Sequence, residues 1–247
     1  MEYTLEPLHD NNFPTADQVT RQVFLTNTQL LDLGASGAFW TVNNHTWTGM
    51  NEHQDGKPYN NTTPSDNAPY LIQIYNEGSK AIPDYENAVQ NHAGWDPEFN
   101  VYPARLGEVI DIILLNQPNG QDGGGRGTYN ATENEMKLQN YRPIQRDTSF
   151  LYKYTYDDDA TAADAYTDQG WRVWRLRVAN PGVWMIHCPT LQHMVIGMQA
   201  VFVMGNSSQI TRVVLPDLVE GSLTYGGDAY GNSTYDPLVT HSHDEEA

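Results

Sequence analysis

Short runs of β-branched and aromatic residues, interrupted by polar ones, recur along most of the chain. Runs of this length and composition are typical of β-strands. They predict strands at residues 21–31, 37–44, 68–76, 108–116, 171–178, 182–188 and 198–205. Turn-forming residues separate several of them, for example Asn43-Asn44 and Asn180-Pro181-Gly182. Many short strands joined by such turns predict an all-β fold, either a sandwich or a barrel.

Helical signals are few. Residues 83–92 predict one short helix, and residues 132–141 predict a second. In the second, Thr132 is the expected N-cap, because Glu135 follows three residues later and completes a capping-box pattern. The all-β class therefore includes one or two short helices.

The domain organisation is expected to be simple. The sequence has no internal repeat and no interdomain linker, which predicts a single domain over residues 1–247 with its core at about 13–205. An acidic tail, rich in Gly, Asp, Ser and His, occupies about residues 226–247 and is expected to lie on the surface.

The charge balance narrows the possible partners. The 247 residues include 13 Lys and Arg against 31 Asp and Glu, a net charge of −18. Such a chain does not neutralise a nucleic-acid backbone, and an acidic membrane surface repels it. No apolar run approaches the roughly 20 residues of a membrane-spanning helix. A small molecule or another protein remains as partner.

The sequence gives only weak indications of localisation. The N-terminal residues MEYTLEPLHDNNF lack the basic start and apolar middle of a signal peptide, so a leader was either removed or never present. Asn-x-Ser/Thr sequons favour a secretory route and glycosylation. They occur at Asn44, Asn60, Asn61, Asn130, Asn206 and Asn232.

Possible metal ligands gather in the stretch HCPTLQHMVIGM, residues 187–198. Cys188 is the only cysteine, and His193 and Met198 follow it by five and ten residues. A type 1 copper site uses two histidines and one cysteine in a plane with a weak axial methionine. Cys188 would end one strand, His193 would lie in the loop, and Met198 would begin the next strand.

The stretch NPGVWMIHCPTLQHMVIGM resembles the last copper motif of multicopper oxidases, in particular fungal ascorbate-oxidase-like and laccase-like enzymes. FPTADQVTRQVFL, FWTVNNHTW, NVYPARLGEVIDIILLN and GWRVWRLRV are similar to the third domain of the same family. The resemblance implies a cupredoxin-like Greek-key fold. It also implies that Cys188, His193 and Met198 match type 1 copper ligands and that His187 matches a ligand of the trinuclear cluster.

Two departures from the family pattern leave the copper set incomplete. Pro189 stands where the family has a second cluster histidine, and the family's His-Pro-x-His-x-His segment has no counterpart after residues 108–116. No histidine lies between His92 and His187. The family's first domain, which supplies further cluster ligands, is also not part of this sequence. Four-electron reduction of oxygen by this chain alone is therefore not expected.

Two interpretations of the motif remain open. One interpretation makes Cys188 and Met198 vestigial copper ligands, and the other makes them ordinary core residues. Similarly, His187 and His193 are either structural histidines or groups that act in acid–base chemistry and hydrogen bonding. Loss of the histidine segment would leave a gap suited to a small molecule. The candidate residues are His187, His193, Tyr152 and Tyr154 for catalysis, and Trp184, Met185 and Met198 for ligand contact.

The first functional hypothesis is therefore a copper-depleted domain that binds a small organic molecule and promotes a cyclisation, cycloaddition or isomerisation in fungal secondary metabolism, without a cofactor. The alternative is a copper-binding oxidoreductase, or an accessory subunit, that completes its copper site with a partner chain. An exposed strand edge would permit a homodimer. The arginines of the strand at 171–178 (Arg172, Arg175 and Arg177) are expected to face solvent or to pair with carboxylates.

Overall fold

The computed structural model describes residues 5–32, 37–45, 47, 70–117, 129–138, 142–149, 170–195 and 197–213. Its strands are β1 (Arg21–Asp32), β2 (Gly37–Val42), β3 (Tyr102–Ala104), β4 (Val109–Gln117), β5 (Trp171–Arg177), β6 (Gly182–His187) and β7 (Gln199–Met204). The helices are α1 (Tyr70–Glu77), α2 (Tyr85–Asn91), α3 (Ala131–Leu138), α4 (Leu191–Val195) and α5 (Ser207–Val213). The described residues also form two 3-10 turns, η2 (Ala16–Gln18) and η3 (Gly78–Ala81).

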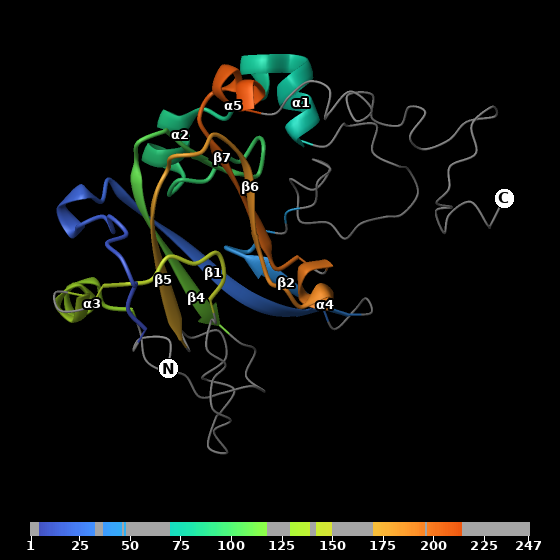
Figure 1. The fold of residues 1–247 in the computed structure, drawn as a ribbon. Helices are drawn as coiled ribbons and strands as arrows, with labels where there is room; N and C mark the ends of the chain where they lie inside the picture. Colours follow the sequence, from blue (N-terminus) through green and yellow to red (C-terminus); the bar gives the residue numbers. More distant parts are fainter. Residues whose placement is uncertain are drawn as a thin grey trace, which may run out of the picture. The chain divides into compact units, whose positions relative to one another are not determined.

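The strands of the described residues form two sheets, whose arrangement Figure 1 shows. The four-stranded sheet has the order β2-β1-β4-β5, in which β1 and β4 are parallel and the other two pairs are antiparallel. The three-stranded sheet has the order β3-β7-β6. The predicted all-β class is confirmed, although the described residues contain five short α-helices where one or two were expected.

The central strand β4 has every residue from Val109 to Asn116 buried, so it is covered on both faces. Its neighbour β1 alternates instead, with Val23 and Leu25 buried and Phe24 exposed. In the parallel register Val23 lies opposite Ile112. Both strands are interior, so the sheet is covered on both faces at β4 and less completely at β1.

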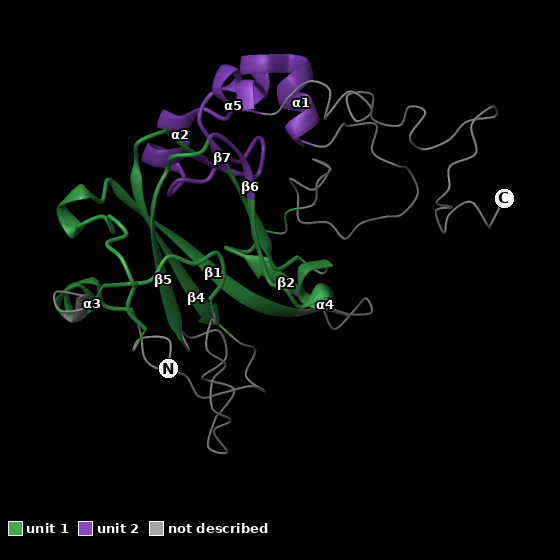
Figure 2. Cartoon of the chain, viewed as in Figure 1, with its two compact units in different colours: residues 1–47, 104–180, 185–202 green, residues 48–103, 181–184, 203–247 purple. Residues whose placement is uncertain are grey.

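The chain divides into two compact units (Figure 2). Unit 1 contains residues 1–47, 104–180 and 185–202, and unit 2 contains residues 48–103, 181–184 and 203–247. Cys188, His193 and Met198 all belong to unit 1. The single-domain organisation stays a prediction, and the proposed acidic tail lies outside the described residues.

The predicted strand at 68–76 is wrong, because residues 70–77 form the helix α1. Within unit 2, α1 packs against η3 and α5. The hydroxyl of buried Tyr70 donates to the carbonyl of Ala81 at 2.6 Å, and that of Tyr75 donates to the carbonyl of Thr211 at 3.3 Å. A short apolar run fits a buried helix as well as a strand, and these tertiary contacts select the helix.

Both predicted helices are present. In α2, the side chain of Asp84 accepts from the backbone N–H of Asn87 at 3.1 Å and caps the helix. The predicted cap of α3 is wrong, because the helix begins at Ala131 and Asn130 caps it by accepting from the backbone N–H of Glu133 at 3.2 Å. Asn is as good an N-cap as Thr, and here it precedes Thr132 and starts the helix earlier.

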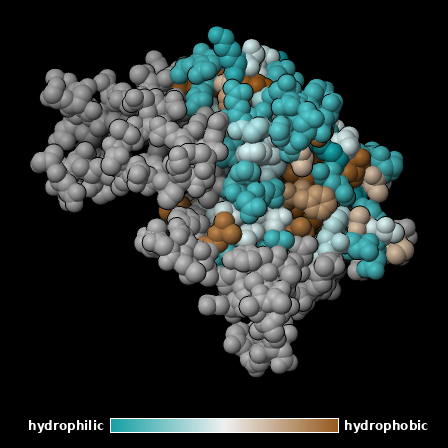
Figure 3. Space-filling view, turned by 180° about the vertical axis from the view of Figure 1, so that it is seen from behind, coloured by the Kyte–Doolittle hydropathy of each residue, from teal (hydrophilic) through white to brown (hydrophobic). Residues whose placement is uncertain are grey.

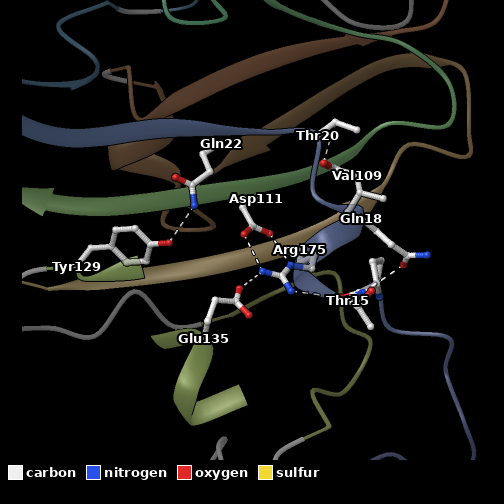
Figure 4. Close-up of polar contacts among 10 residues, drawn as sticks. Thr15, Gln18, Thr20, Gln22, Val109, Asp111, Tyr129, Glu135 and Arg175 are labelled. Carbon is white, nitrogen blue, oxygen red and sulfur yellow. Dashed lines mark hydrogen bonds and ion pairs between the residues drawn. The ribbon is translucent and has the colours of Figure 1, made fainter. Parts of the chain in front are cut away.

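The side chain that would complete a capping box, Glu135, instead contacts Arg175 on β5 (Figure 4). Arg175 also forms a bidentate pair with Asp111 on β4, at 2.7 and 2.9 Å. The side chains of Arg175 and Asp111 are 4% and 3% exposed. The Arg175 guanidinium further donates to the Pro14 carbonyl and lies 5.6 Å from the ring centroid of Phe13. One buried cation therefore joins β4, β5, α3 and the N-terminal segment.

Hydrogen bonding to Asp111 raises the pKa of Arg175, and burial opposes this shift. Of the two alternatives expected for the arginines of this strand, Arg175 takes the second: it pairs with carboxylates and does not face solvent. Arg177 is exposed and donates to the side chain of Gln18.

Tyr129 anchors the residues that lead into α3. Its hydroxyl accepts from Gln22 at 3.3 Å, and its ring packs edge-on against Phe24 and Trp171, with centroids 6.0 and 5.5 Å apart. Burial, followed by the nearby carboxylate of Asp111, raises the pKa of Tyr129. The chain is therefore fixed to the four-stranded sheet immediately after residues 118–128, the part of the sequence in which the family's histidine segment has no counterpart. Among the described residues, no helix is long and apolar enough to cross a membrane.

Candidate functional site

Cys188 and His193 lie together at the end of β6. The thiol Sγ of Cys188 is 3.6 Å from Nδ1 of His193. The intervening residues turn through α4, which returns His193 toward the cysteine. Two backbone hydrogen bonds close this segment: Cys188 N–H donates to the Met198 carbonyl at 3.1 Å, and Met198 N–H donates to the His193 carbonyl at 2.9 Å. The predicted proximity of this cysteine and histidine is present in the structure, with a helix in place of the expected loop.

The imidazole of His193 packs against Trp40 of β2. The two ring centroids are 5.0 Å apart and the ring planes are inclined by 36°. Trp40 is 7% exposed, and its indole Nε1 is buried without a hydrogen-bond partner among the described residues. A buried indole N–H usually finds an acceptor, so this donor is an exception.

His187 is exposed and is turned toward its own backbone. Its Nδ1 lies 3.0 Å from the carbonyl oxygen of Cys188. Because a carbonyl oxygen only accepts, Nδ1 must carry the proton of this bond. In the neutral ring the lone pair is then on Nε2, and that nitrogen is available to accept a proton or to bind a metal.

The other predicted site residues are less closely associated. Met198 is half-buried, and the hydrogen bonds that join it to Cys188 and His193 are made by its backbone. Met185 and Trp184 are exposed to 44% and 46%, but Trp184 belongs to unit 2 and Met185 to unit 1. Tyr152 and Tyr154 lie outside the described residues.

Exposed apolar side chains flank the cysteine–histidine pair along the chain. On the single turn of α4, Leu191 and Val195 are 68% and 69% exposed. On the face that Figure 3 presents, most described residues are hydrophilic and apolar ones are interspersed among them. Leu191 and Val195 on α4 and Met185 on β6 are thus exposed apolar residues close to the pair in the sequence.

The pair Cys188 and His193 fits one edge of a metal site. Two ligands that bind the same tetrahedral metal at about 2.3 Å for sulfur and 2.1 Å for nitrogen are separated by about 3.6 Å. The observed distance between Sγ and Nδ1 equals this value. Among the described residues, no group of three or more His, Cys, Asp or Glu side chains is arranged to hold a metal. The described residues thus supply two donors at a spacing that a metal ion permits, and not the complete set of a type 1 copper site.

Three sequon asparagines can be placed, and all three are exposed. Asn44 is in the turn after β2, with φ of 62°. Asn130 caps α3, and the side chain of Asn206 accepts from the backbone N–H of Gln209 in α5. Asn60, Asn61 and Asn232 lie outside the described residues, and glycosylation stays a prediction at all six.

Residues 41–208 match the family model described as multicopper oxidase. This match covers more than half of the chain and includes β6, α4 and β7. The chain therefore belongs to the multicopper oxidase family, and the resemblance noted in the sequence is confirmed.

Two curated relatives from fungi are similar over almost the whole chain. Multicopper oxidase terE of Aspergillus terreus is 52% identical over 262 residues, which is 99% of this chain and 48% of terE. Multicopper oxidase aurL2 of Gibberella zeae is 37% identical, over 100% of this chain and 43% of aurL2. The chain thus spans less than half the length of these relatives.

The crystal structure of laccase from Botrytis aclada supports the fold. It matches 97% of this chain and 37% of the laccase chain with a TM-score of 0.55 and 14% sequence identity. At this identity the likeness concerns the cupredoxin-like architecture alone.

Proposed function

We propose that this chain is a copper-depleted member of the multicopper oxidase family that binds a small organic molecule beside β6 and α4. The bound molecule undergoes a step without net oxidation, such as a cyclisation, cycloaddition or isomerisation, in a fungal biosynthetic pathway. The observation that carries the proposal is the exposed imidazole of His187, whose Nδ1 is held by the Cys188 carbonyl.

This hydrogen bond selects one tautomer of His187 in the neutral ring. Nε2 then acts as a hydrogen-bond acceptor or as a general base toward a hydroxyl or an acidic C–H group of a ligand. Met185 lies two residues before His187 on β6, so both side chains leave the same face of the strand. An exposed thioether beside an imidazole offers apolar contact next to one polar group, which is the composition of a small-molecule site.

The sequence supports loss of the complete copper set. Pro189 has no donor atom for a metal, and the segment between His92 and His187 contains no histidine. The comparison with terE extends over 262 residues whereas this chain has 247, so at least 15 aligned positions of terE have no residue opposite them here. A loss of this size is consistent with the missing histidine segment.

Binding of two probes tests the proposal. 1-Naphthol donates a hydrogen bond through its hydroxyl, and naphthalene has the same rings without a donor. Because one hydrogen bond is worth about 1 kcal/mol, the wild-type protein is expected to bind 1-naphthol about five times more tightly than naphthalene. His187→Ala removes this preference, and Cys188→Ala retains it. A preference that survives His187→Ala would contradict the assignment.

A second function is favoured by the distance of 3.6 Å between Cys188 Sγ and His193 Nδ1. In this alternative the two residues hold copper together with ligands from a partner chain, and the domain serves as an oxidoreductase or as an accessory subunit. Copper, when bound, would supply one-electron redox chemistry. Stoichiometric copper in the purified protein, with the intense visible absorption of thiolate-to-copper charge transfer, would favour this function over the first. His193→Ala should abolish that absorption.

A further inference from the structure

We infer that Trp40 is the positioning residue of the site: the face of its indole ring holds the His193 imidazole with Nδ1 toward Cys188. This inference rests on the proposed function, because it takes residues 187–198 as part of the functional site. The geometry itself concerns only unit 1, which contains all three residues.

The helix α4 does not hold His193 in place by its own packing. It has five residues, none of them buried, and its two apolar ends, Leu191 and Val195, point their side chains into solvent. His193 lies between them in sequence and is half-buried. A single helical turn is not stable without tertiary contacts. The ring contact between His193 and Trp40, with centroids 5.0 Å apart, is the aromatic contact that joins α4 to β2.

Trp40 is suited to this role because its own position is fixed. It lies opposite Gln29 in the antiparallel pair of β1 and β2, and β1 is an interior strand of the four-stranded sheet. Its side chain is 7% exposed, so it has little freedom to change rotamer. The rigid sheet thereby orients the imidazole through the indole, and the imidazole in turn meets the thiol at 3.6 Å.

Because the indole N–H of Trp40 has no hydrogen-bond partner among the described residues, substitutions can test whether the aromatic face of Trp40 positions His193 or whether Trp40 only fills space. Since Trp40 Nε1 has no acceptor among the described residues, the ring face and not the N–H makes the contact with His193. Phenylalanine keeps an aromatic face and removes the buried donor. Trp40→Phe is therefore expected to preserve the His193 orientation, although the smaller ring leaves a cavity that lowers stability. Trp40→Leu keeps an apolar side chain but removes the aromatic face.

The experiment records the ¹⁵N NMR signals of the two ring nitrogens of His193. The wild-type protein is compared with Trp40→Phe and Trp40→Leu. Leu191→Ala is the matched control, because it changes an exposed residue of the helix that contains His193. The wild type is expected to show one dominant tautomer and proton–proton NOEs between the indole and the imidazole. Trp40→Phe and Leu191→Ala retain the single tautomer. Trp40→Leu loses it and shifts the His193 signals toward those of a solvent-exposed imidazole that exchanges between tautomers.

Absence of the indole–imidazole NOEs in the wild type would overturn the inference without recourse to any variant, so it remains testable if Trp40→Leu does not fold. An unchanged His193 spectrum in folded Trp40→Leu would also overturn it and leave Trp40 as a packing residue. The two proposals can fail separately. If only the proposed function is wrong, the protein shows no preference for 1-naphthol over naphthalene, while its His193 spectrum still depends on Trp40.

Discussion

The protonation state of His45 is coupled to folding. It ends the two-residue turn Asn43-Asn44, where its backbone pairs with Val42. Burial lowers the pKa of His45 below its ordinary value of about 6.5, because desolvation penalises the charged ring. The unfolded chain therefore binds more protons than the folded one below this value.

It follows that the stabilising contribution of neutral His45 is fully present above about pH 6.5 and is lost as the pH falls toward the lowered pKa of the folded state. We expect the free energy of unfolding, measured by urea titration, to decrease between pH 7.5 and pH 5.5. His45→Gln should flatten this decrease, whereas the exposed-site control His9→Gln should leave it unchanged. An equal slope in both variants would show that other groups cause the pH dependence.

Arg175 provides the second prediction at the scale of single residues. Replacing it with Met leaves the carboxylate of Asp111 buried without its cation, a change that costs about 3–5 kcal/mol in other buried ion pairs. We expect Arg175→Met to lower the free energy of unfolding by an amount in this range, measured by urea denaturation. Arg177→Met, two residues further along β5 and exposed, should change it by less than about 0.5 kcal/mol.

The site residues differ in how far the sequence could reveal them. The spacing of Cys188 and His193 carries the copper motif of the family, so their proximity was predictable. Trp40 was visible only as an aromatic residue in a predicted strand, because alternation along β2 does not specify which distant loop packs against it. Arg175 was similarly ambiguous, since a sequence pattern does not show that Asp111 and Glu135 converge on the same strand.

At the scale of elements, the cap of α3 gives a direct test of the structure against the sequence pattern. Asn130 accepts from the backbone N–H of Glu133 and thereby takes the N-cap role that the pattern assigns to Thr132. We expect Asn130→Ala to reduce the free energy of unfolding by about 1 kcal/mol. Thr132→Ala should have a much smaller effect, because this exposed residue lies inside the helix. Chemical denaturation of both variants measures the difference, and the opposite order would restore Thr132 as the cap.

The strands were more predictable than the helices for a physical reason. Six of the seven predicted strands form because β-branched and aromatic side chains suit a half-buried pleated surface. Residues 70–77 carry the same residue types, yet packing against η3 and α5 makes them helical. The helix α4 was missed because a single turn of five residues gives no periodicity to detect.

At the scale of the whole molecule, family membership and ligand count lead to different expectations about chemistry. The chain belongs to the multicopper oxidase family and spans 48% of terE. Reduction of oxygen by four electrons requires several copper ions acting together, and each ion requires its own ligands. Pro189 and the absence of histidine from residues 93–186 remove ligands that the family motif would provide.

We therefore expect this chain, after incubation with copper and a phenolic electron donor, to consume no more oxygen than the same concentration of free copper. An oxygen electrode measures the rate, and terE under identical conditions is the positive control. Because the missing ligands cannot be restored by one substitution, Pro189→His alone should not change the result. Oxygen consumption with four donor molecules oxidised per oxygen would contradict the proposal, since it requires histidines outside the family motif, such as His241 and His243, to complete the copper set.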